Sequence, residues 1–399
     1  MKSVLGSIWF WARQIRAGHV CIAVVSIFYL LLVSLAAAQS NAGILQTVQL
    51  IDDGTSIRVP VRVFESTKYF SIDTGSTICM LDSNYKEKLG KPLKEAPLEN
   101  GLVGEMKVKV FAAPDIFLGE TKLNVRRILC SELTLFRLVT GEPFDGVIGM
   151  DALDDYTVVL DFDQSTLALY SKTPAEFTEL GKPVPLISAN GRYHIEATAN
   201  RKAKVQLLLD SGSGNSISLN RTDWEQAFAD SPQASRSATL GTIGGHIVES
   251  PLARLKTLTI GSRTVTNLVC TLSKNPTSYS SVGLPFLRQY RVAFDFPNKL
   301  LYLAPRLHVI DEEWDMSGLH LLRQSGLVAV YSVDPDSPAD KAGIKARDII
   351  TVIDGKNCTK LTMRDIRQHF KTKDGNRVKV KVFRNGEVLD FEFQLRKMI

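Results

Sequence analysis

The stretch Phe70-Ser71-Ile72-Asp73-Thr74-Gly75-Ser76 returns in similar form 137 residues later, as Leu207-Leu208-Leu209-Asp210-Ser211-Gly212-Ser213. In both stretches an apolar run typical of a strand leads into Asp, a hydroxyl residue, Gly and Ser. Such sequences are also common in ordinary turns, so one copy alone would indicate only a loop that ends a strand. Two copies supply two aspartates in equivalent positions, which an acid–base pair of carboxyl groups requires.

A second internal similarity indicates that the chain arose by duplication. Residues 149–169 align without a gap on residues 283–303 at an offset of 134, with identity at eight of 21 positions. This offset differs by only three residues from that of the two aspartates. A repeat of this length is too long for a solenoid unit. We therefore expect two homologous lobes that face each other and bring Asp73 and Asp210 together by symmetry.

The composition is that of a globular protein. The chain has 399 residues, of which 44% are hydrophobic and 23% are charged, enough for two or three domains with cores of their own. Half of the formal net charge of +6 lies in the first 38 residues. The small remainder argues against nucleic acid as a partner. The sequence lacks CxxC, HExxH and His-rich patterns, so it predicts no metal and no cofactor.

Residues 1–38 form a segment of their own, with a basic start and an apolar run from Val20 to Ala38 that ends in small residues. This pattern predicts an export signal. The run is also about as long as a membrane-spanning helix, which leaves an uncleaved anchor as an alternative. Both alternatives place the rest of the chain outside the cytoplasm: periplasmic, secreted or anchored in the inner membrane.

Four cysteines follow this segment: Cys79, Cys130, Cys270 and Cys358. An exported protein can form disulfides, but four cysteines allow three pairings and the sequence does not choose among them. We expect all four to be buried free thiols.

The rest of the chain divides into three parts. Short β-branched and aromatic runs, typical of antiparallel strands, fill residues 45–172 and 173–306, and the Pro- and Gly-rich stretch 171–190 predicts the connection between them. Residues 314–399 predict strands at 326–333 and 348–353, a short helical turn, a helix capped by Thr362 and a hairpin that turns at Asn385-Gly386.

The paired aspartates predict a specific chemistry. Two carboxyl groups about 3 Å apart cannot both ionise cheaply, so they share one proton. One can then act as a base toward water and the other as an acid toward a carbonyl oxygen. Gly75 and Gly212 have no side chain at the places where the two loops must approach each other.

These residues resemble the aspartic peptidase clan that includes the pepsins and the retroviral proteases. The resemblance covers residues 45–305 and extends to Val147-Ile148-Gly149 and, less closely, to Ser281-Val282-Gly283. It implies that Asp73 and Asp210 are the catalytic pair. Because the lobes are closer in size to a retroviral subunit than to a pepsin lobe, we expect a fused, single-chain retropepsin-like dimer.

The same resemblance implies roles for the neighbouring hydroxyl residues. Thr74 and Ser211 would lock the two loops together through hydrogen bonds across the interface. Ser76 and Ser213 would hydrogen-bond the outer carboxylate oxygens.

The clan covers its substrate with a hairpin flap, for which the candidates are residues 100–106 and 240–246. Both are rich in glycine, as a moving hairpin requires, but neither contains the tyrosine typical of pepsin flaps.

Residues 314–399 resemble a bacterial PDZ domain, through the segments Ser337-Pro338-Ala339, Ala342-Gly343-Ile344, Asp348-Ile349-Ile350 and Ile353-Asp354-Gly355. By this resemblance Gly318, Leu319, His320 and Leu321 form the loop and strand that capture a peptide C-terminus by strand addition. The implied ligands are the tails of other polypeptides or the chain's own end, Met398-Ile399.

Two other chemistries fit the sequence less well. Gly214-Asn215-Ser216 is similar to the nucleophile loop of exported serine proteases, with His194 or His246 as a base, but Ile217 and Ser218 stand where an oxyanion hole would need glycines. A phosphate loop would need a Lys after its glycines. Asp161 and Asp295, which occupy matched positions, are expected in strand-turn corners.

The sequence thus predicts a mostly β protein with two homologous aspartic-protease β-barrel lobes in one chain, followed by an α+β PDZ domain. We expect a bacterial aspartic endopeptidase that acts on polypeptide substrates. The competing hypothesis is a catalytically silent adaptor of the same fold that binds peptide tails.

Overall fold

The computed structural model describes residues 43–100, 104–178, 182–229, 235–241, 246–273, 278–308 and 313–399. The predicted export signal or anchor lies outside these ranges. Within them, no helix combines the length and the apolar character that crossing a membrane would take.

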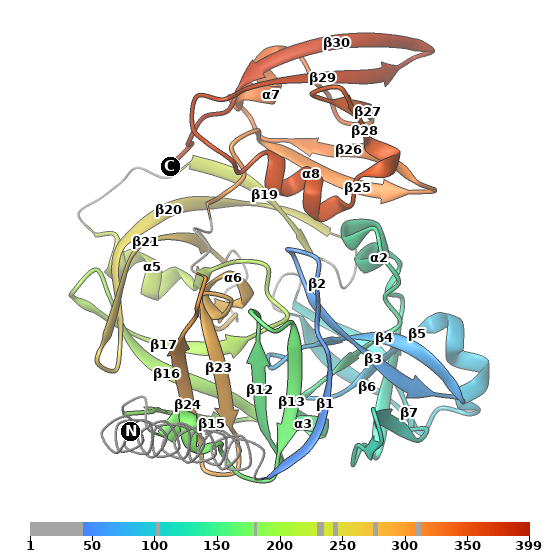
Figure 1. Ribbon diagram of the computed structural model, residues 1–399, viewed down its shortest axis with the longest axis vertical. Helices are drawn as coiled ribbons and strands as arrows, with labels where there is room; N and C mark the ends of the chain where they lie inside the picture. The colour runs from blue at the N-terminus through green and yellow to red at the C-terminus, as the bar shows by residue number, and fades with distance from the viewer. Residues whose placement is uncertain are drawn as a thin grey trace, which may run out of the picture.

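Strands from both halves of the chain meet in one antiparallel sheet at the base of the molecule (Figure 1). Its order is β1 (Ile44–Gln49), β13 (Thr166–Tyr170), β12 (Thr157–Asp161), β23 (Tyr290–Asp295), β24 (Leu300–Pro305) and β14 (Val184–Pro185). The central pair, β12 and β23, places Val159 opposite Ala293. These strands belong to the two aligned repeats, so the repeats meet at the middle of this sheet.

The two homologous parts of the chain, residues 45–172 and 173–306, also form one sheet each. We call them lobe one and lobe two. The sheet of lobe one has the order β6 (Lys94–Asn100), β7 (Gly104–Ala112), β10 (Arg127–Ser131), β5 (Met80–Asp82), β11 (Gly146–Ile148), β4 (Ser66–Ile72), β3 (Ile57–Val63), β8 (Ile116–Leu118) and β9 (Thr121–Lys122), with β2 (Ile51–Asp52) beside β3. The sheet of lobe two has the order β15 (Ile187–Ala189), β16 (Arg192–Ala199), β17 (Ala203–Asp210), β22 (Ser281–Gly283), β18 (Ile217–Leu219), β21 (Arg263–Leu272), β20 (His246–Ile260) and β19 (Ser235–Gly241).

The two lobes share one topology around the aspartates. The strand that leads to the Asp loop, β4 or β17, pairs in parallel with a short strand, β11 or β22. That short strand pairs antiparallel with the strand that follows the loop, β5 or β18. The predicted duplication is therefore confirmed as a repeated fold, and the predicted apolar-Gly elements are β11 and β22 with the glycines that end them.

Helices are few and short in the part of the chain that the structure describes. They are the 3-10 helices η1 (Ser83–Leu89) and η2 (Cys358–Lys360) and the α-helices α2 (Thr134–Thr140), α3 (Met150–Leu153), α4 (Ala175–Thr178), α5 (Arg221–Ala227), α6 (Leu284–Leu287), α7 (Pro338–Ala342) and α8 (Met363–His369). The predicted connection at 171–190 is more ordered than expected, because it contains α4, β14 and β15. Its β14 pairs with β24 and so joins the base sheet.

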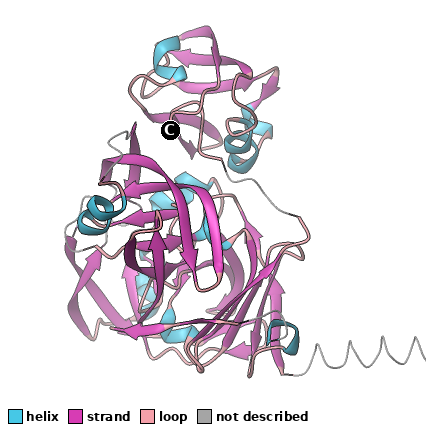
Figure 2. Ribbon diagram, turned by 90° about the vertical axis from the view of Figure 1, so that its left-hand side faces the viewer, coloured by secondary structure: helices cyan, strands magenta, loops and turns pink. Residues whose placement is uncertain are grey.

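Residues 313–399 form a separate C-terminal unit above the lobes, as Figures 1 and 2 show. Its sheet has the order β25 (Leu319–Gln324), β26 (Leu327–Val333), β27 (Ile349–Ile353), β29 (Arg377–Arg384) and β30 (Glu387–Gln394), with β28 (Lys356–Asn357) beside β27. The predicted local signals are confirmed: Thr362 and Asp365 form a capping box on α8, and Asn385 and Gly386 turn the last hairpin with φ of 51° and 90°.

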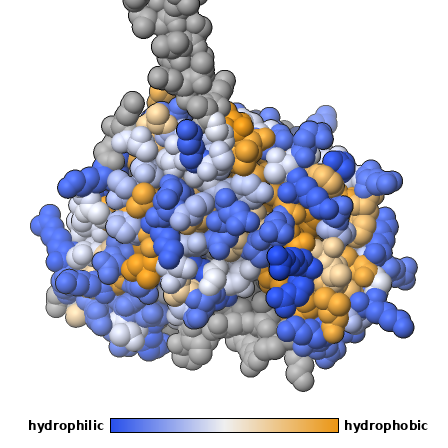
Figure 3. All heavy atoms as spheres, turned by 90° about the horizontal axis from the view of Figure 1, so that it is seen from below, coloured by the Kyte–Doolittle hydropathy of each residue, from blue (hydrophilic) through white to orange (hydrophobic). Residues whose placement is uncertain are grey.

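The hydrophobic cores follow the same division. One core runs through both lobes and includes the buried Val59, Leu160, Leu207 and Phe294, whereas the C-terminal unit has its own core around Val330, Ile366 and Phe370. On the face seen from below, polar side chains cover most of the visible surface and hydrophobic ones gather in patches between them (Figure 3).

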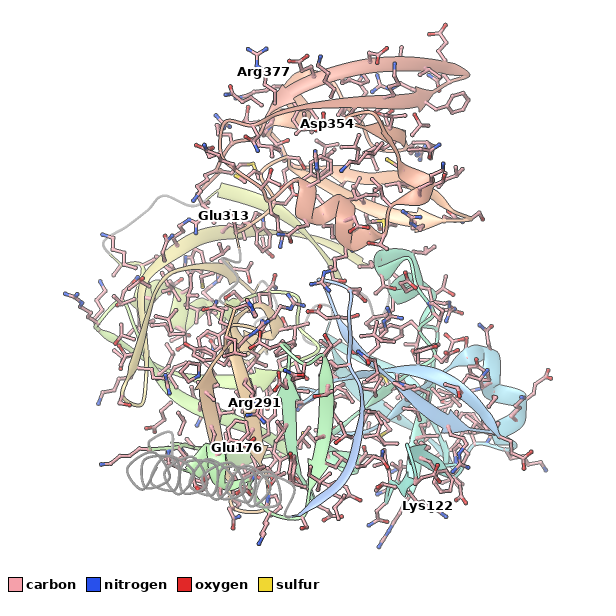
Figure 4. The ribbon with its side chains drawn as sticks, viewed as in Figure 1. Lys122, Glu176, Arg291, Glu313, Asp354 and Arg377 are labelled. Atoms are coloured by element: carbon pink, nitrogen blue, oxygen red, sulfur yellow. The ribbon has the colours of Figure 1, made fainter. Side chains whose placement is uncertain are left out.

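Asp161 and Asp295 lie in strand-turn corners, as expected. Asp161 accepts the N–H groups of Asp163 and Gln164 at 3.0 and 2.9 Å, and Asp295 accepts that of Asn298 at 3.1 Å. Arg291 of β23 forms ion pairs with Asp161 and with Glu176 of α4, which lies beside it at the base of the molecule (Figure 4).

All four cysteines of the described ranges are free thiols. Cys79, Cys270 and Cys358 are buried as predicted, but the prediction was wrong for Cys130, which is half-buried. Cys130 packs against the outside of the main core, so solvent reaches one side of it.

Candidate active site

The two Asp loops meet at the interface of the lobes, and their glycines make this approach possible. A Cβ atom on Gly212 would lie 2.4 Å from Cγ of Asp73, and one on Gly75 would lie 2.7 Å from Cγ of Asp210. Real Cβ atoms do not tolerate such contacts. Each aspartate therefore packs on the glycine of the opposite loop, and the structure brings Asp73 and Asp210 together.

Thr74 and Ser211 join the loops across the interface. The N–H of Thr74 donates to Oγ of Ser211 at 3.0 Å, and the N–H of Ser211 donates to Oγ1 of Thr74 at 3.0 Å. The hydroxyl groups in turn donate to the carbonyl groups of Leu209 and Ile72, each at 2.8 Å. The bonds that the resemblance implied for these two residues are present.

Ser76 and Ser213 are placed differently from the expectation. The hydroxyl of Ser76 donates to the carbonyl oxygen of Ile78 at 2.9 Å, and Oγ of Ser213 accepts the N–H of Asn215 at 3.3 Å. A hydroxyl has one proton, and that of Ser76 is used within its own turn. The carboxylate of Asp73 instead accepts backbone N–H groups, from Gly75 at 2.9 Å and from Ser76 at 3.1 Å.

The surroundings of the pair raise the pKa of both aspartates. Burial raises the pKa of Asp73 above its ordinary value, against the effect of the N–H groups of Gly75 and Ser76. Burial and then the charge of Asp73 raise the pKa of Asp210 to about 8. The pair therefore holds one shared proton over a wide pH range.

Arg192 of β16 is a site residue that sequence reasoning missed. Its Nε donates to the carbonyl oxygen of Gly75 at 3.0 Å, and its guanidinium lies 5.6 Å from the ring centre of Tyr279. Its positive charge favours the ionised form of Asp73. A lone Arg at the start of a strand carries no sequence signal, so only the fold reveals this contact.

The aspartates line a cavity of about 780 Å³ that both lobes and the C-terminal unit enclose. Lobe one contributes Phe136 and Val139 of α2, and lobe two contributes Arg192 and Tyr279. The four residues predicted to bind peptide tails, Gly318, Leu319, His320 and Leu321, line the same cavity. No motif or spacing in the sequence indicates that the two predicted sites share one cavity.

The predicted tail-binding loop already holds a carboxylate of the chain itself. Oδ1 of Asp315 accepts the N–H groups of Ser317 and Gly318 at 2.8 and 2.9 Å, and the N–H of Leu319 donates to Oγ of Ser317 at 3.1 Å. The Asp-x-Ser sequence of residues 315–317 is a known local turn signal that could have indicated this arrangement.

The C-terminal unit contacts both lobes. Arg364 of α8 donates to the carbonyl oxygen of Asp52 at 2.7 Å, and Arg367 donates to that of Val139 at 2.5 Å. On lobe two, Arg254 donates to the carbonyl oxygen of Ile399 at 3.0 Å and pairs with Glu313, which is labelled in Figure 4. Ile399 therefore lies against lobe two.

The candidate flaps are hairpins. Asn100 pairs with Gly104 between β6 and β7, and Gly241 pairs with His246 between β19 and β20. The tips, residues 101–103 and 242–245, lie outside the described residues, so their role as flaps stays a prediction.

The alternative chemistries gain no support from the geometry. The hydroxyl of Ser216 has no hydrogen-bond partner among the described residues, so it makes no contact with a base there. In the same part of the chain, no group of three or more His, Cys, Asp or Glu side chains is placed to hold a metal ion.

Comparison with known proteins places this site in a class. Residues 59–152, which include Asp73 but not Asp210, match the aspartyl protease family, and residues 316–395 match the PDZ domain. Among solved structures, the aspartic proteinase from Irpex lacteus is similar over 66% of this chain and 97% of that chain, with 14% identity and a TM-score of 0.41. No curated protein matches the chain.

Residues 59–152 are thus similar to an aspartyl protease domain and residues 316–395 to a PDZ domain, and the topology of the first is repeated in lobe two. The predicted fold class, mostly β with a PDZ domain at the C-terminus, is confirmed. At the level of the class, these matches support a peptidase that acts on peptide substrates.

Proposed function

We propose that the chain is an aspartic endopeptidase that hydrolyses peptide bonds with Asp73 and Asp210 and an activated water. The observation that carries this proposal is the mutual packing of the two Asp loops, in which each glycine contacts the opposite carboxyl group. A protease fold that only bound peptides would not need two carboxyl groups held so closely, because their shared burial is costly.

We give Asp210 the role of the acid, because its raised pKa favours the protonated form, and Asp73 the role of the base. The oxygen of the attacking water forms a bond to the carbonyl carbon of the substrate, while Asp73 takes a proton from that water. Asp210 gives its proton to the carbonyl oxygen. The tetrahedral intermediate then collapses as the C–N bond breaks: Asp73 gives its proton to the leaving nitrogen, and one hydroxyl of the intermediate returns a proton to Asp210 as the new carbonyl group forms.

Two features suggest where the enzyme works and what it cuts. The basic and apolar segment of residues 1–38 supports export to the periplasm or anchoring in the inner membrane. The PDZ domain, whose predicted groove lines the catalytic cavity, would recruit the polypeptide substrate or regulate its access.

The decisive experiment compares the chain from residue 39 onward with its Asp73→Asn and Asp210→Asn variants, using denatured casein and mass spectrometry of the products. We expect cleavage by the unmodified chain, inhibition by pepstatin, and a loss of at least a thousandfold in both variants. Asp161→Asn is the matched control, because this aspartate caps a turn at the base sheet. Casein binding without cleavage would favour the silent adaptor, and equal cleavage by both variants would exclude the mechanism.

A further inference from the structure

The outer edge of the PDZ sheet opens into the catalytic cavity. β25 is the last strand in the order of its sheet, so within the described residues no strand pairs with its outer side. Residues Leu319 to Leu322 of this strand line the cavity together with Asp73 and Asp210. An edge strand offers its backbone N–H and C=O groups to an added strand.

One end of this edge is already covered. A Cβ atom on Gly141, which follows α2, would lie 2.8 Å from Met363 and 3.0 Å from Arg323, so lobe one packs against α8 and β25. Arg367 also joins Val139 of α2 to Leu321 of β25. The part from Leu319 to Leu322 is the part that faces the cavity. A peptide that pairs with it would lie on the path toward the dyad.

The loop before β25 cannot receive a terminal carboxylate without losing bonds of its own. The carboxylate of Asp315 already accepts hydrogen bonds from the N–H groups of Ser317 and Gly318, and the Ser317 hydroxyl oxygen accepts one from the N–H of Leu319. A second carboxylate there would compete with Asp315 for these N–H groups and would be repelled by it. A peptide group within a chain carries no charge and avoids this cost.

Arg367 provides a donor in the same space. It lines the cavity, and its Nη2 donates to the carbonyl oxygens of Val139 at 2.5 Å and Leu321 at 3.3 Å. Its Nη1 is buried and has no hydrogen-bond partner in the described part of the chain. A buried, unpaired guanidinium nitrogen is costly, and a turn of the Arg367 side chain toward the cavity would let the carbonyl oxygen of a bound peptide satisfy it.

We propose that the dyad and β25 form one composite groove for an internal, extended segment of the substrate. The segment crosses Asp73 and Asp210, pairs with the edge from Leu319 to Leu322 and accepts a hydrogen bond from Arg367. The PDZ domain then binds internal, unfolded segments of its substrates, and its affinity does not depend on a free C-terminal carboxylate. This proposal rests on the proposed peptidase function and specifies its substrate class.

The first test measures whether the terminal charge matters. Two fluorescein-labelled forms of oxidised insulin B chain, one with a free C-terminal carboxylate and one with a C-terminal amide, are titrated with the Asp210→Asn full chain and followed by fluorescence polarisation. We expect the two Kd values to agree within about twofold. A preference of tenfold or more for the free acid, or no binding of either form, would overturn the proposal.

Asp315 variants sharpen this test. Asp315→Ala empties the loop, so we expect the free acid to bind about tenfold more tightly than the amide in that variant. Asp315→Asn keeps an acceptor oxygen on the same N–H groups, so we expect this variant to bind the free acid and the amide with similar Kd values. A folded Asp315→Ala chain that remains indifferent would contradict the role given to Asp315. If Asp315→Ala does not fold, the comparison of acid and amide on the Asp210→Asn chain still decides the proposal.

Arg367 is tested on the same helix against a matched neighbour. Arg367→Gln is expected to weaken binding of the amide form about tenfold, because a charged donor to the substrate is lost. Arg364→Gln removes the same charge from a residue whose Nη1 already donates to Asp52, and a much smaller effect is expected. Equal effects of the two variants would overturn the role of Arg367.

These measurements separate the two proposals. Binding to the Asp210→Asn chain requires no cleavage, so a preference for free C-termini would count against the composite groove alone. Failure of the unmodified chain to cut casein would count against the peptidase function.

Discussion

Thr74 and Ser211 hold each other by reciprocal hydrogen bonds, each N–H donating to the hydroxyl oxygen of the other at 3.0 Å. Both residues are buried, with exposed fractions of 1% and 0%. Each comes directly after one of the two aspartates, so these bonds fix the distance between the loops that carry the dyad. The geometry of the dyad therefore depends on two buried side chains beside it.

Removal of one hydroxyl should weaken this connection. Thr74→Val keeps the shape of the side chain but leaves the carbonyl of Leu209 and the N–H of Ser211 without partners, at a cost of about 1–3 kcal/mol for each group. We expect a lower urea midpoint and a fall in kcat/KM of at least tenfold. Thr264→Val, which removes an exposed hydroxyl that contacts Thr259, should stay within about 0.5 kcal/mol. Similar losses in both variants would refute the special role of Thr74.

Substitutions of Gly212 and Gly214 should differ strongly in their effect on activity. In Gly212→Ala the new methyl group would stand 2.4 Å from Cγ of Asp73 and must push the carboxyl groups apart, so we expect activity on casein to fall at least a hundredfold. Gly214→Ala, in the same loop, meets nothing closer than the carbonyl oxygen of Thr55 at 3.8 Å and should lose far less. Circular dichroism spectra would show whether both variants are folded. Full activity in Gly212→Ala would mean that the loops are not packed as described.

The pKa order predicts the pH profile of kcat/KM. The reaction needs the proton on Asp210, whose pKa is raised to about 8, so activity should fall as pH rises through this region. It also needs the charge on Asp73, whose raised pKa moves the acid limb of the profile above the ordinary range of an aspartate. Steady-state rates on a fluorogenic peptide from pH 3 to 10 would check this. Activity that keeps rising in alkali would exclude the proton-sharing pair.

The same shift predicts how stability depends on pH. Because the folded state binds the proton of Asp210 more tightly than the unfolded state does, its contribution to stability is complete below the pKa of an unfolded aspartate. It is lost progressively as pH rises toward about 8. We expect Tm to fall between pH 4 and pH 8 in the natural chain and to fall less in Asp210→Asn. An unchanged slope in the variant would show that Asp210 is not the group responsible.

Much of the fold could be predicted because its signals are local or repeated. The two Asp stretches and the aligned repeats at 149–169 and 283–303 lie in equivalent strands, and the cap at Thr362 and the turn at Asn385-Gly386 form as expected. Each of these depends on residues close together in the sequence or on a comparison of the chain with itself.

What could not be predicted depends on contacts between distant parts of the chain. The bond from Arg192 to Gly75 joins the lobes, and the bond from Arg367 to Val139 joins the PDZ domain to lobe one. No periodicity or motif encodes either contact. The hydroxyl of Ser76 was assigned to the carboxylate by resemblance, but the nearer carbonyl of Ile78 competes for its single proton.

The helix α2 lies between the dyad and the PDZ domain, and one buried residue anchors it. Asp82, with an exposed fraction of 0%, accepts the N–H of Leu133 and a bond from Arg137, both at 2.9 Å. Asp82→Ala leaves the N–H of Leu133 without its acceptor and Arg137 without this partner, and should cost about 1–3 kcal/mol. Hydrogen exchange of α2 should rise, and with it that of the PDZ surface it contacts. Asp115→Ala, which breaks an exposed pair with Lys122, should cost about 0–1 kcal/mol and leave α2 protected. Unchanged exchange in Asp82→Ala would mean that α2 is held by its hydrophobic contacts alone.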